Sequence, residues 1–528
     1  MSENGTPGRN ESTRRSEEHP IQNEECNEQR ALRLDKLTTL KANGLDPFAI
    51  ERFERSHTPA EIVAEDAGHW SLPDEERVQL CMSVAGRLTS ERSSGKVSFA
   101  DIRDETGRVQ LYIKRDEVGE DVFAAFKLFD LSDLVGVKGY PFTTRTGERT
   151  IHVKEIVLLA KAIRPVPFGK QDEQGNIYGA LTDKEERYRH RYLDLLVNPD
   201  AREILTKRCK IVSAMRRFLD GEGFLEVETP VLQLVAGGAS ARPFMTHHNA
   251  LDFDFKLRIS LELFLKRLIV GGYDKVYEIG RVFRNEGVSA RHNPEFTLME
   301  LYQAYANLED IMELVENMYV SICEAVNGKP VFQYKGEQID LSIRPWKRLP
   351  MLEGIHLYAG IRPEELASLE TAHAACRRIG VQFNVEAETN LGGLIEKLHE
   401  VYTQPHLIQP TFITDFPVET SPLAKMRQDN PALTRRFEVY AATQELGNAF
   451  SEINDPIDQR ARFEGQLTQR EEGNDEAHPM DEDFLLALEY GMPPTGGLGI
   501  GMDRLALILT EAESIRDVLL FPLMRPER

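Results

Sequence analysis

The sequence predicts an α+β protein with two folded parts, a small five-stranded barrel followed by a larger domain that mixes strands and helices. The chain has 528 residues, and at roughly 100 to 200 residues per domain this length accommodates two to four domains. Apolar residues alternate with a period of two between residues 76 and 160, and a stretch rich in Gly and Pro follows. We therefore expect a disordered tail at 1–30, an N-terminal helix and barrel at 31–164, a linker at 165–182 and a larger domain at 183–528.

The tail is rich in Glu, Asn, Ser and Arg and holds almost no large apolar side chain. Such a segment cannot bury enough apolar surface to offset the entropy of ordering, so we expect it to be disordered. From Ala31 onward leucines recur at helical spacing up to Leu40, and Lys41 and Gly44 follow. This order is typical of a helix C-terminus, which predicts a short helix before the barrel.

The barrel is predicted from alternating apolar segments. They begin with Val78 to Val84 and Val109 to Ile113, and they continue near 134–142 and 150–158, with a helix-like stretch near 122–128. Five strands with one helix after the third fit a small oligonucleotide-binding (OB) barrel.

The linker and the start of the larger domain are marked by Gly and Pro. Residues 165–182 contain several of both and show no periodicity, which favours a connecting segment. A helical pattern then runs from Ile204 to Leu219, and Gly221 and Gly223 mark its end.

Composition excludes several classes of protein. Lys and Arg total 64 and Asp and Glu total 86, which gives a formal charge of −22. A net negative charge disfavours nonspecific binding to nucleic acid and to anionic membranes. A locally basic groove is still compatible with this net charge, because charges are screened beyond about 10 Å at 0.1 M salt. No apolar run approaches the roughly 18 residues of a membrane span. The five cysteines form no C-x-x-C pair, so we expect reduced thiols and a cytoplasmic, membrane-free protein.

Arginines are the candidate nucleotide ligands, because the chain has neither a Walker A sequence nor a G-x-G-x-x-G that opens a helix. A strand-like run ends in Arg284 and Glu286, and its return strand is expected at 295–302. An ordinary half-exposed hairpin is the alternative. Alternation of side chains along the return strand gives one candidate binding face, formed by Phe296, Leu298, Glu300 and Tyr302.

Three acidic residues, Glu438, Glu445 and Glu452, lie in a second strand-like region. Carboxylates suit Mg²⁺, which takes oxygen ligands and is commonly shared with substrate phosphates. A solvated acidic face is the alternative. Asn448 and Phe450 have the spacing that places them on the same strand face as Glu452.

Glycine occupies every second position from Gly497 to Gly501, and Arg504 follows at the start of a predicted helix. Glycines on one strand face leave no side chains there, which suits a flat ligand lying on the sheet. A cation at a helix N-terminus opposes the helix dipole. Arg504 is therefore expected to face either a phosphate or a structural carboxylate.

Taken together, these segments resemble the signature motifs of class II aminoacyl-tRNA synthetases. Motif 1 is similar to GFLEVETP at 223–230, motif 2 to FRNE at 283–286 with RHNPEFT at 291–297, and motif 3 to GLGIGMDR at 497–504. The resemblance implies a catalytic domain built on an antiparallel sheet flanked by helices. It also implies a homodimer, in which the strand after Gly223 lies at the interface.

Within this class the chain resembles the lysyl-tRNA synthetases. The resemblance rests on GGASARPFMT at 237–246, QPTFITDFP at 409–417 and FPLMRP at 521–526. It implies that the chain is an enzyme that converts ATP and L-lysine to lysyl-adenylate and pyrophosphate, then passes the lysyl group to tRNA(Lys) and releases AMP. ATP would act as co-substrate with about two to three Mg²⁺ ions.

The resemblance also implies roles for individual residues. Arg284 would hold the α-phosphate and the substrate carboxylate, and Arg504 would hold the γ-phosphate and stack on adenine opposite Phe296; these are the two catalytic residues. The expected ATP contacts are Arg284, Glu286, His292, Asn293, Phe296 and Arg504. The expected lysine contacts are Gly238, Glu262, Glu300, Tyr302, Asn448, Phe450 and Glu452. Glu438 and Glu445 would bind the metal, and Arg87, Phe99, Gln110 and Glu155 would bind the anticodon.

Chemistry separates the rival substrates. An aspartate side chain needs cations around it, whereas an ammonium needs carboxylates, and Glu262 with Glu452 would leave a neutral isostere poorly matched. This argues against an enzyme for aspartate or asparagine. The retained barrel argues against a paralogue that lysylates proteins. A noncatalytic relative is expected to lack some of Arg284, Glu438, Glu445 and Arg504, and all four are present.

Three positions leave questions for the structure. Ala449 stands where the family usually has glycine, and Leu261 where it has proline. We expect the added methyl of Ala449 to lie beside the substrate, a change worth about 1 to 3 kcal/mol. Phe99 is expected to stack on an anticodon base, and a place in the barrel core is the alternative.

Overall fold

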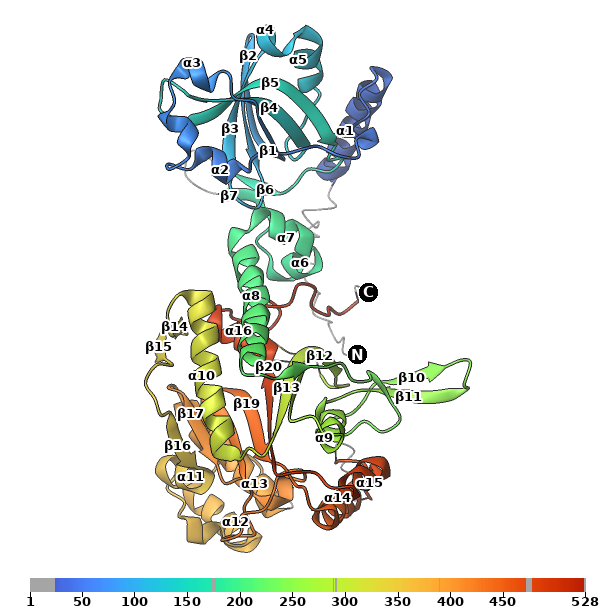
Figure 1. Ribbon diagram of the computed structural model, residues 1–528, viewed down its shortest axis with the longest axis vertical. Coiled ribbons are helices and arrows are strands. Elements are labelled where there is room, and N and C mark those ends of the chain that lie inside the picture. The colour runs from blue at the N-terminus through green and yellow to red at the C-terminus, as the bar shows by residue number, and fades with distance from the viewer. Residues whose placement is uncertain are drawn as a thin grey trace, which may run out of the picture. The chain divides into compact units, whose positions relative to one another are not determined.

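The computed structural model describes residues 24–171, 177–287, 289, 292–388, 390–471 and 477–526 (Figure 1). The chain forms two compact units, residues 1–197 and 198–528. Residues 1–23 of the predicted tail lie outside the described residues, as does Arg291 of the motif 2 region. Among the described residues, no helix has the length and apolar character needed to cross a bilayer.

The first unit begins with a helix that starts earlier than predicted. Helix α1 spans Glu24–Ala42, so the last residues assigned to a disordered tail, 24–30, are helical. The signal for an earlier start is weak, because the first turns of α1 carry mostly polar side chains. Leu40 near its C-terminus is fully buried and joins the barrel core. Two short helices follow, α2 (Pro59–Val63) and α3 (Asp74–Arg77).

Five strands close into the predicted barrel in the order β1-β2-β3-β5-β4. The helical turns α4 and α5 follow the third strand, as predicted. The first strand begins at Met82 rather than Val78, since Val78 is exposed and ends helix α3. The bounds are β1 (Met82–Ser94), β2 (Val97–Arg103), β3 (Arg108–Lys114), α4 (Arg115–Val118), α5 (Glu120–Phe126), β4 (Leu134–Thr143) and β5 (Arg149–Ala160).

The predicted linker contains regular structure. Strands β6 (Phe168–Gln171) and β7 (Ile177–Ala180) pair in antiparallel fashion. Helices α6 (Lys184–Arg189) and α7 (Arg191–Val197) also belong to the first unit. The predicted boundary at residue 183 therefore precedes the start of the second compact unit, at Asn198, by two short helices.

The second unit is built on an eight-stranded sheet in the order β16-β17-β18-β19-β20-β13-β12-β8. Its central pairs are antiparallel, and only the outer pairs β16–β17 and β12–β8 are parallel. The bounds are β8 (Leu225–Glu226), β12 (Lys275–Phe283), β13 (Glu295–Ala304), β16 (Lys347–Pro350), β17 (Thr411–Thr414), β18 (Arg436–Ala441), β19 (Gln444–Ser451) and β20 (Thr495–Gly501).

One face of this sheet carries the main hydrophobic core. Side chains such as Met299, Leu301, Leu498 and Ile500 pack there against α8 (Pro199–Gly221), α10 (Leu308–Asn327) and α16 (Met502–Leu509), and Figure 1 shows α8 and α10 side by side. Since successive strand residues point to opposite faces, the intervening residues point away from this core. That second face holds the pocket described below.

Smaller elements border the sheet. Helix α9 (Glu262–Val270) packs with α14 (Pro456–Glu471) and α15 (Glu482–Glu489) in one cluster, and α11 (Met351–Ala359), α12 (Leu369–Ile379) and α13 (Leu391–Leu398) form another with β16 and β17. The hairpin of β10 (Met245–His248) and β11 (Phe253–Leu257) projects from the unit beside β9 (Leu232–Gln233) (Figure 1). A second hairpin consists of β14 (Val331–Tyr334) and β15 (Glu337–Asp340).

Candidate functional site

A pocket of about 490 Å³ lies on the face of the sheet opposite the main core. Strands β13, β19 and β20 supply its floor, and segments after β12 and before α9 supply its walls. The structure brings together here every residue predicted for catalysis, ATP, the amino acid and the metal. These are Gly238, Glu262, Arg284, Glu286, His292, Asn293, Phe296, Glu300, Tyr302, Glu438, Glu445, Asn448, Phe450, Glu452 and Arg504.

Glycines form part of the floor, as the sequence predicts for a flat ligand. A Cβ on Gly501 would meet nothing within 4 Å, and one on Gly499 would come no nearer than 3.6 Å to Glu300. These two glycines therefore leave open space above the sheet. Gly497 differs, because a Cβ there would overlap Glu452 Oε1 and lie 2.6 Å from the ring of Tyr302.

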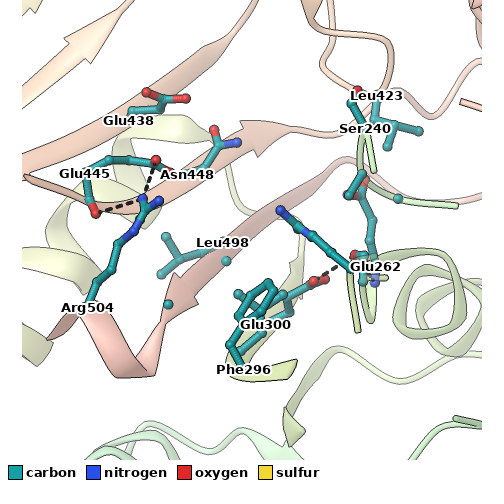
Figure 2. Close-up of a pocket in the computed structure, with 18 of the residues that line it drawn as sticks. Ser240, Glu262, Phe296, Glu300, Leu423, Glu438, Glu445, Asn448, Leu498 and Arg504 are labelled. Carbon is teal, nitrogen blue, oxygen red and sulfur yellow. Dashed lines mark hydrogen bonds and ion pairs between the residues drawn. The ribbon is translucent and has the colours of Figure 1, made fainter. Parts of the chain in front are cut away.

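Arg504 lies at one end of the pocket, beside two carboxylates (Figure 2). Its guanidinium donates to Glu445 Oε2 over 2.7 Å. Glu438 accepts from Arg436 over 2.7 Å and from the hydroxyl of Tyr440 over 2.6 Å. Burial and the nearby charge of Glu445 raise the pKa of Glu438 to about 7. At this end two carboxylates therefore lie near each other, and each has an arginine partner.

These carboxylates suit a hard cation. Among the described residues, no group of three or more His, Cys, Asp or Glu side chains is arranged to hold a metal ion by itself. Magnesium, however, commonly takes one or two carboxylates together with substrate phosphates. Glu438 and Glu445 supply oxygen donors, and burial together with the charge of Glu445 raises the pKa of Glu438. The donor set fits Mg²⁺ shared with a phosphate-bearing ligand.

Arg284, rather than Arg504, lies against the ring of Phe296. Its guanidinium carbon is 5.0 Å from the ring centroid, within cation–π range. Burial lowers the pKa of Arg284, and Glu286, Glu300 and Glu445 oppose this effect by their charges. Arg504 instead contacts Glu445, and the expected stacking of Arg504 on adenine, with Phe296 on the opposite side of the base, stays a prediction.

Asp503 anchors the motif that carries Arg504 and was missed by the sequence analysis. Its carboxylate accepts from Arg208 of α8 over 2.6 Å and from the backbone N–H of Thr297 over 3.0 Å. These bonds tie the first turn of α16 to strand β13. Asp503 directly precedes Arg504 at the start of the predicted helix. This position is a signal that could have suggested its anchoring role.

Glu300 occupies the other end of the pocket. Its Oε1 accepts from Ser260 Oγ over 2.8 Å and from the backbone N–H of Leu261 over 3.0 Å, and its Oε2 accepts from the hydroxyl of Tyr302 over 3.1 Å. Burial and the charge of Glu262 raise its pKa to about 7. Leu261 thus supplies a backbone donor that a proline at this position would lack.

Glu262 and Glu452 lie next to each other but are bridged by Lys266, which the sequence analysis missed. The ammonium of Lys266 is 2.5 Å from Glu262 Oε1 and also contacts Glu452 Oε2. Lys266 follows Glu262 by one helical turn on α9, and this i,i+4 spacing could have predicted the first contact. Burial raises the pKa of both carboxyl groups, and the two carboxylates raise the pKa of Lys266.

The expectation for Ala449 is wrong. Its side chain belongs to the main core on the far face of the sheet, whereas its neighbours Asn448 and Phe450 line the pocket. Alternation along β19 turns the extra methyl away from the pocket. It therefore does not narrow the binding space.

His478 is a further residue at the pocket that the sequence did not indicate. Its Nε2 accepts from the backbone N–H of Gly238 over 2.7 Å, and its ring stacks on Phe463. Burial lowers its pKa to about 4, so the ring is neutral and able to accept at pH 7. The contact fixes the loop that carries Gly238 in a positive-φ conformation.

A second candidate site lies on the outer surface of the barrel. Phe99 projects outward, since both of its neighbours on β2, Ser98 and Ala100, are buried. Its ring is 5.2 Å from that of Tyr112, which in turn contacts Phe142 and His152. Phe99 is therefore part of an aromatic patch rather than of the barrel core.

The other predicted anticodon residues are spread along the barrel. Gln110 lies on β3 near this patch and accepts from Thr150. Arg87 is far along β1, where it donates to the carbonyl of Ser132, and Glu155 is an exposed partner of Lys138. The arginine opposite Phe99 in the β1–β2 register is Arg92.

Comparison with known proteins finds a matching protein family for each of the two units. Residues 183–525 match a family described as class II tRNA synthetases (D, K and N), and residues 82–159 match the OB-fold nucleic acid binding domain family. Among similar proteins named lysine–tRNA ligase, that of Bacillus subtilis (strain 168) is 51% identical over 511 residues, which cover 96% of this chain and 99% of the relative. That of Thermoanaerobacter sp. (strain X514) is 50% identical over 506 residues, 96% of this chain and 97% of the relative.

The contrast between two floor glycines predicts different costs of substitution. Gly497→Ala should destabilise the second unit by about 1 to 3 kcal/mol, as overpacking does, because the buried Glu452 and Tyr302 must move. Gly501→Ala should change the free energy of unfolding by no more than about 0.5 kcal/mol, since its Cβ would meet open space. Denaturant unfolding of both variants checks this, and equal effects would show that the floor at Gly497 is not close-packed.

Proposed function

The chain belongs to the class II tRNA synthetases of the aspartate, lysine and asparagine group, and we propose from that membership how its pocket works. It activates L-lysine with ATP and transfers the lysyl group to its tRNA. The observation that carries the choice of lysine is the cluster of buried carboxylates, Glu262, Glu300 and Glu452, at one end of the pocket. Carboxylates match an ammonium, whereas aspartate or asparagine would leave them unpaired.

The two ends of the pocket divide the work. Lysine lies with its ammonium toward Glu262 and Glu452 and its α-amino group toward Glu300. Its carboxylate is directed to Arg284, between this end of the pocket and the end that holds Arg504, which we call the arginine end. ATP occupies the region of Arg504, with adenine on the glycine floor and near Phe296, and with Glu286, His292 and Asn293 around it.

The lysine carboxylate attacks the α-phosphate, and pyrophosphate leaves. The attacking group is already ionised, so the reaction needs no general base from the protein. Arg284 orients the carboxylate and the α-phosphate and neutralises developing charge. Arg504 holds the γ-phosphate and offsets charge on the pyrophosphate that leaves. Mg²⁺ held by Glu438 and Glu445 would offset further phosphate charge.

The barrel reads the anticodon in this proposal. An outward aromatic patch around Phe99 supplies a surface on which bases stack, and such stacking is sequence-tolerant. Gln110 adds an amide for base discrimination. Arg92, opposite Phe99, is better placed than Arg87 to meet a phosphate or base there. We place the protein in the cytoplasm, where a charged tRNA is used in translation.

A second copy of the chain is the proposed partner of an apolar surface around the β10–β11 hairpin. Leu234, Met245 and Phe253 are 61%, 58% and 48% exposed, and Leu225 on β8 is 48% exposed. Contiguous exposed apolar side chains of this kind mark interaction sites. Stable obligate interfaces commonly bury more than about 2,000 Å², and β8, the short strand after Gly223, lies at the edge of the eight-stranded sheet.

Pyrophosphate exchange into ATP across all twenty amino acids tests the proposed reaction. Exchange should be strongest with lysine and should require Mg²⁺. Glu445→Gln should raise the Mg²⁺ concentration for half-maximal exchange about tenfold or more, because one carboxylate ligand is lost. The exposed Glu464→Gln on α14 serves as the control and should behave as the parent enzyme. A preference for aspartate or asparagine would remove the lysine assignment.

Substitution of Phe99 tests anticodon stacking. Phe99→Ala should weaken tRNA charging by about 1 to 3 kcal/mol and leave exchange with lysine unchanged, because activation needs only ATP, lysine and metal. Charging, exchange and thermal unfolding should be measured on the same preparation. Phe48→Ala removes another exposed phenylalanine, 55% exposed, that lies outside the aromatic patch, and it should charge normally. Charging that falls only with the melting temperature would point to a folding defect instead.

Sedimentation at micromolar concentration tests the dimer. The parent protein should sediment as a dimer, and the double substitution Leu234→Asp with Phe253→Asp should shift it to the monomer, because two charges would be buried without partners. Leu357→Asp on α11 places the same charge at a side chain that is 60% exposed elsewhere on the unit and should leave the dimer intact. An active parent protein with a monomeric mass would contradict the proposal.

A further inference from the structure

Lys266 is the only described side-chain ammonium in direct contact with the carboxylates of the amino-acid end of the pocket. Its side chain is fully buried, and it does not line the pocket. Its Nζ is 2.5 Å from Glu262 Oε1, contacts Glu452 Oε2, and lies 5.9 Å from the ring centroids of Tyr302 and Phe484. The ammonium is therefore fixed behind the two carboxylates, on the side away from an incoming ligand.

The charges around Lys266 do not balance within the protein. Three buried carboxyl groups face this end, Glu262, Glu300 and Glu452, against one ammonium, so their sum when all three are ionised is 1 − 3 = −2. Arg284 also interacts with the charge of Glu300, but the proposal assigns its charge to the substrate carboxylate. The remaining titratable groups nearby are neutral or paired. The hydroxyl of Tyr302 stays neutral because burial raises its pKa, and His478 stays neutral because burial lowers its pKa to about 4. Arg436 acts on Glu262 only from a distance and is itself paired with Glu438.

A deficit of two positive charges matches the proposed substrate. Lysine brings two ammonium groups to this end, and its carboxylate is directed to Arg284. Without Lys266 the sum would be −3, and closely spaced buried carboxylates that lack a cation bind protons instead. A protonated carboxyl group pairs poorly with an ammonium, so the ionised state of the pair is what makes the end selective.

We propose that Lys266 is a positioning residue for lysine recognition, a built-in counter-ion that favours the ionised form of Glu262 and Glu452 and holds both side chains in place for the substrate ammonium. This inference rests on the proposed lysine specificity of the same pocket. Lys266 touches no reacting atom and acts only through the two carboxylates. Its effect should therefore fall on the affinity for lysine and on the pH at which lysine is bound.

Kinetics of pyrophosphate exchange on Lys266→Met test this. The KM for lysine at pH 7 should rise about 30-fold or more, because a buried charge pair loses one partner. The KM for ATP should change less than about threefold. The pKa of both carboxyl groups rises in the variant, so they are protonated at neutral pH and ionise only at higher pH. The rise in kcat/KM for lysine should consequently move to higher pH, and Lys266→Arg should restore most of the parent profile.

A charge-matched pair of variants keeps the test decisive if Lys266→Met does not fold. Glu262→Gln leaves two carboxylates with Lys266, a sum of −1, whereas Glu262→Gln with Lys266→Met leaves two carboxylates alone, a sum of −2 as in the parent. Although its charge sum equals that of the parent, the double variant should bind lysine more weakly than Glu262→Gln, because Glu452 then lacks its ammonium partner and takes up a proton. Equal or tighter lysine binding by the double variant would overturn the inference.

Controls separate this inference from the proposed function. Lys397→Met removes a surface lysine that pairs with Glu400, and it should leave both KM values unchanged. Failure of the parent enzyme to activate lysine would reject the proposed function itself. A parent enzyme that activates lysine, with Lys266→Met that keeps the parent KM and pH profile, would reject only the role of Lys266. Equal loss of lysine and ATP binding together with a lower melting temperature would assign Lys266 a purely structural part and would also reject it.

Discussion

Alternation of side chains along strands β13, β19 and β20 is the constraint on which the structure of the second unit depends. Each strand sends one set of residues into the core under α8, α10 and α16 and the other set into the pocket. Met299 and Leu301 pack while Glu300 and Tyr302 face the ligand space. A shift of register by one residue would exchange the two sets, so burial of the core also fixes the polar groups of the pocket.

The period of two made much of this predictable. The face shared by Phe296, Glu300 and Tyr302 and the glycine floor both follow from local spacing, and both line the pocket. The roles of Ala449 and Lys266 did not follow. The expectation for Ala449 came from the glycine that the family usually has at this position. It did not take into account the alternation of side chains along β19, which turns Ala449 away from the pocket. The role of Lys266 depends on its contact with Glu452, a residue distant in sequence that only the fold brings next to it.

Irregularities in the backbone account for other differences. A β-bulge between Leu88 and Ser90 shifts the pairing of β1 with β2 by one residue, and this brings Arg92 rather than a neighbour opposite Phe99. Bulges are not visible in an apolar period, so the register that places Arg92 opposite Phe99 could not be derived from the sequence. The hairpin of β6 and β7 was missed for a similar reason, because its strands are only four residues long and lie among Gly and Pro.

The ion pair between Arg504 and Glu445 couples the two ligands of the arginine end. On the proposed assignments a triphosphate draws Arg504 and a divalent cation draws Glu445, and each ligand alone must break the same 2.7 Å contact. The ligand that binds first therefore loses the free energy needed to break the Arg504–Glu445 contact. The second ligand then binds a side chain that is already free of this contact. Linkage requires the benefit to be reciprocal. The pocket should consequently bind nucleotide and metal cooperatively, and it should distinguish the metal–nucleotide complex from either component by a free energy stored in a single contact of the resting protein.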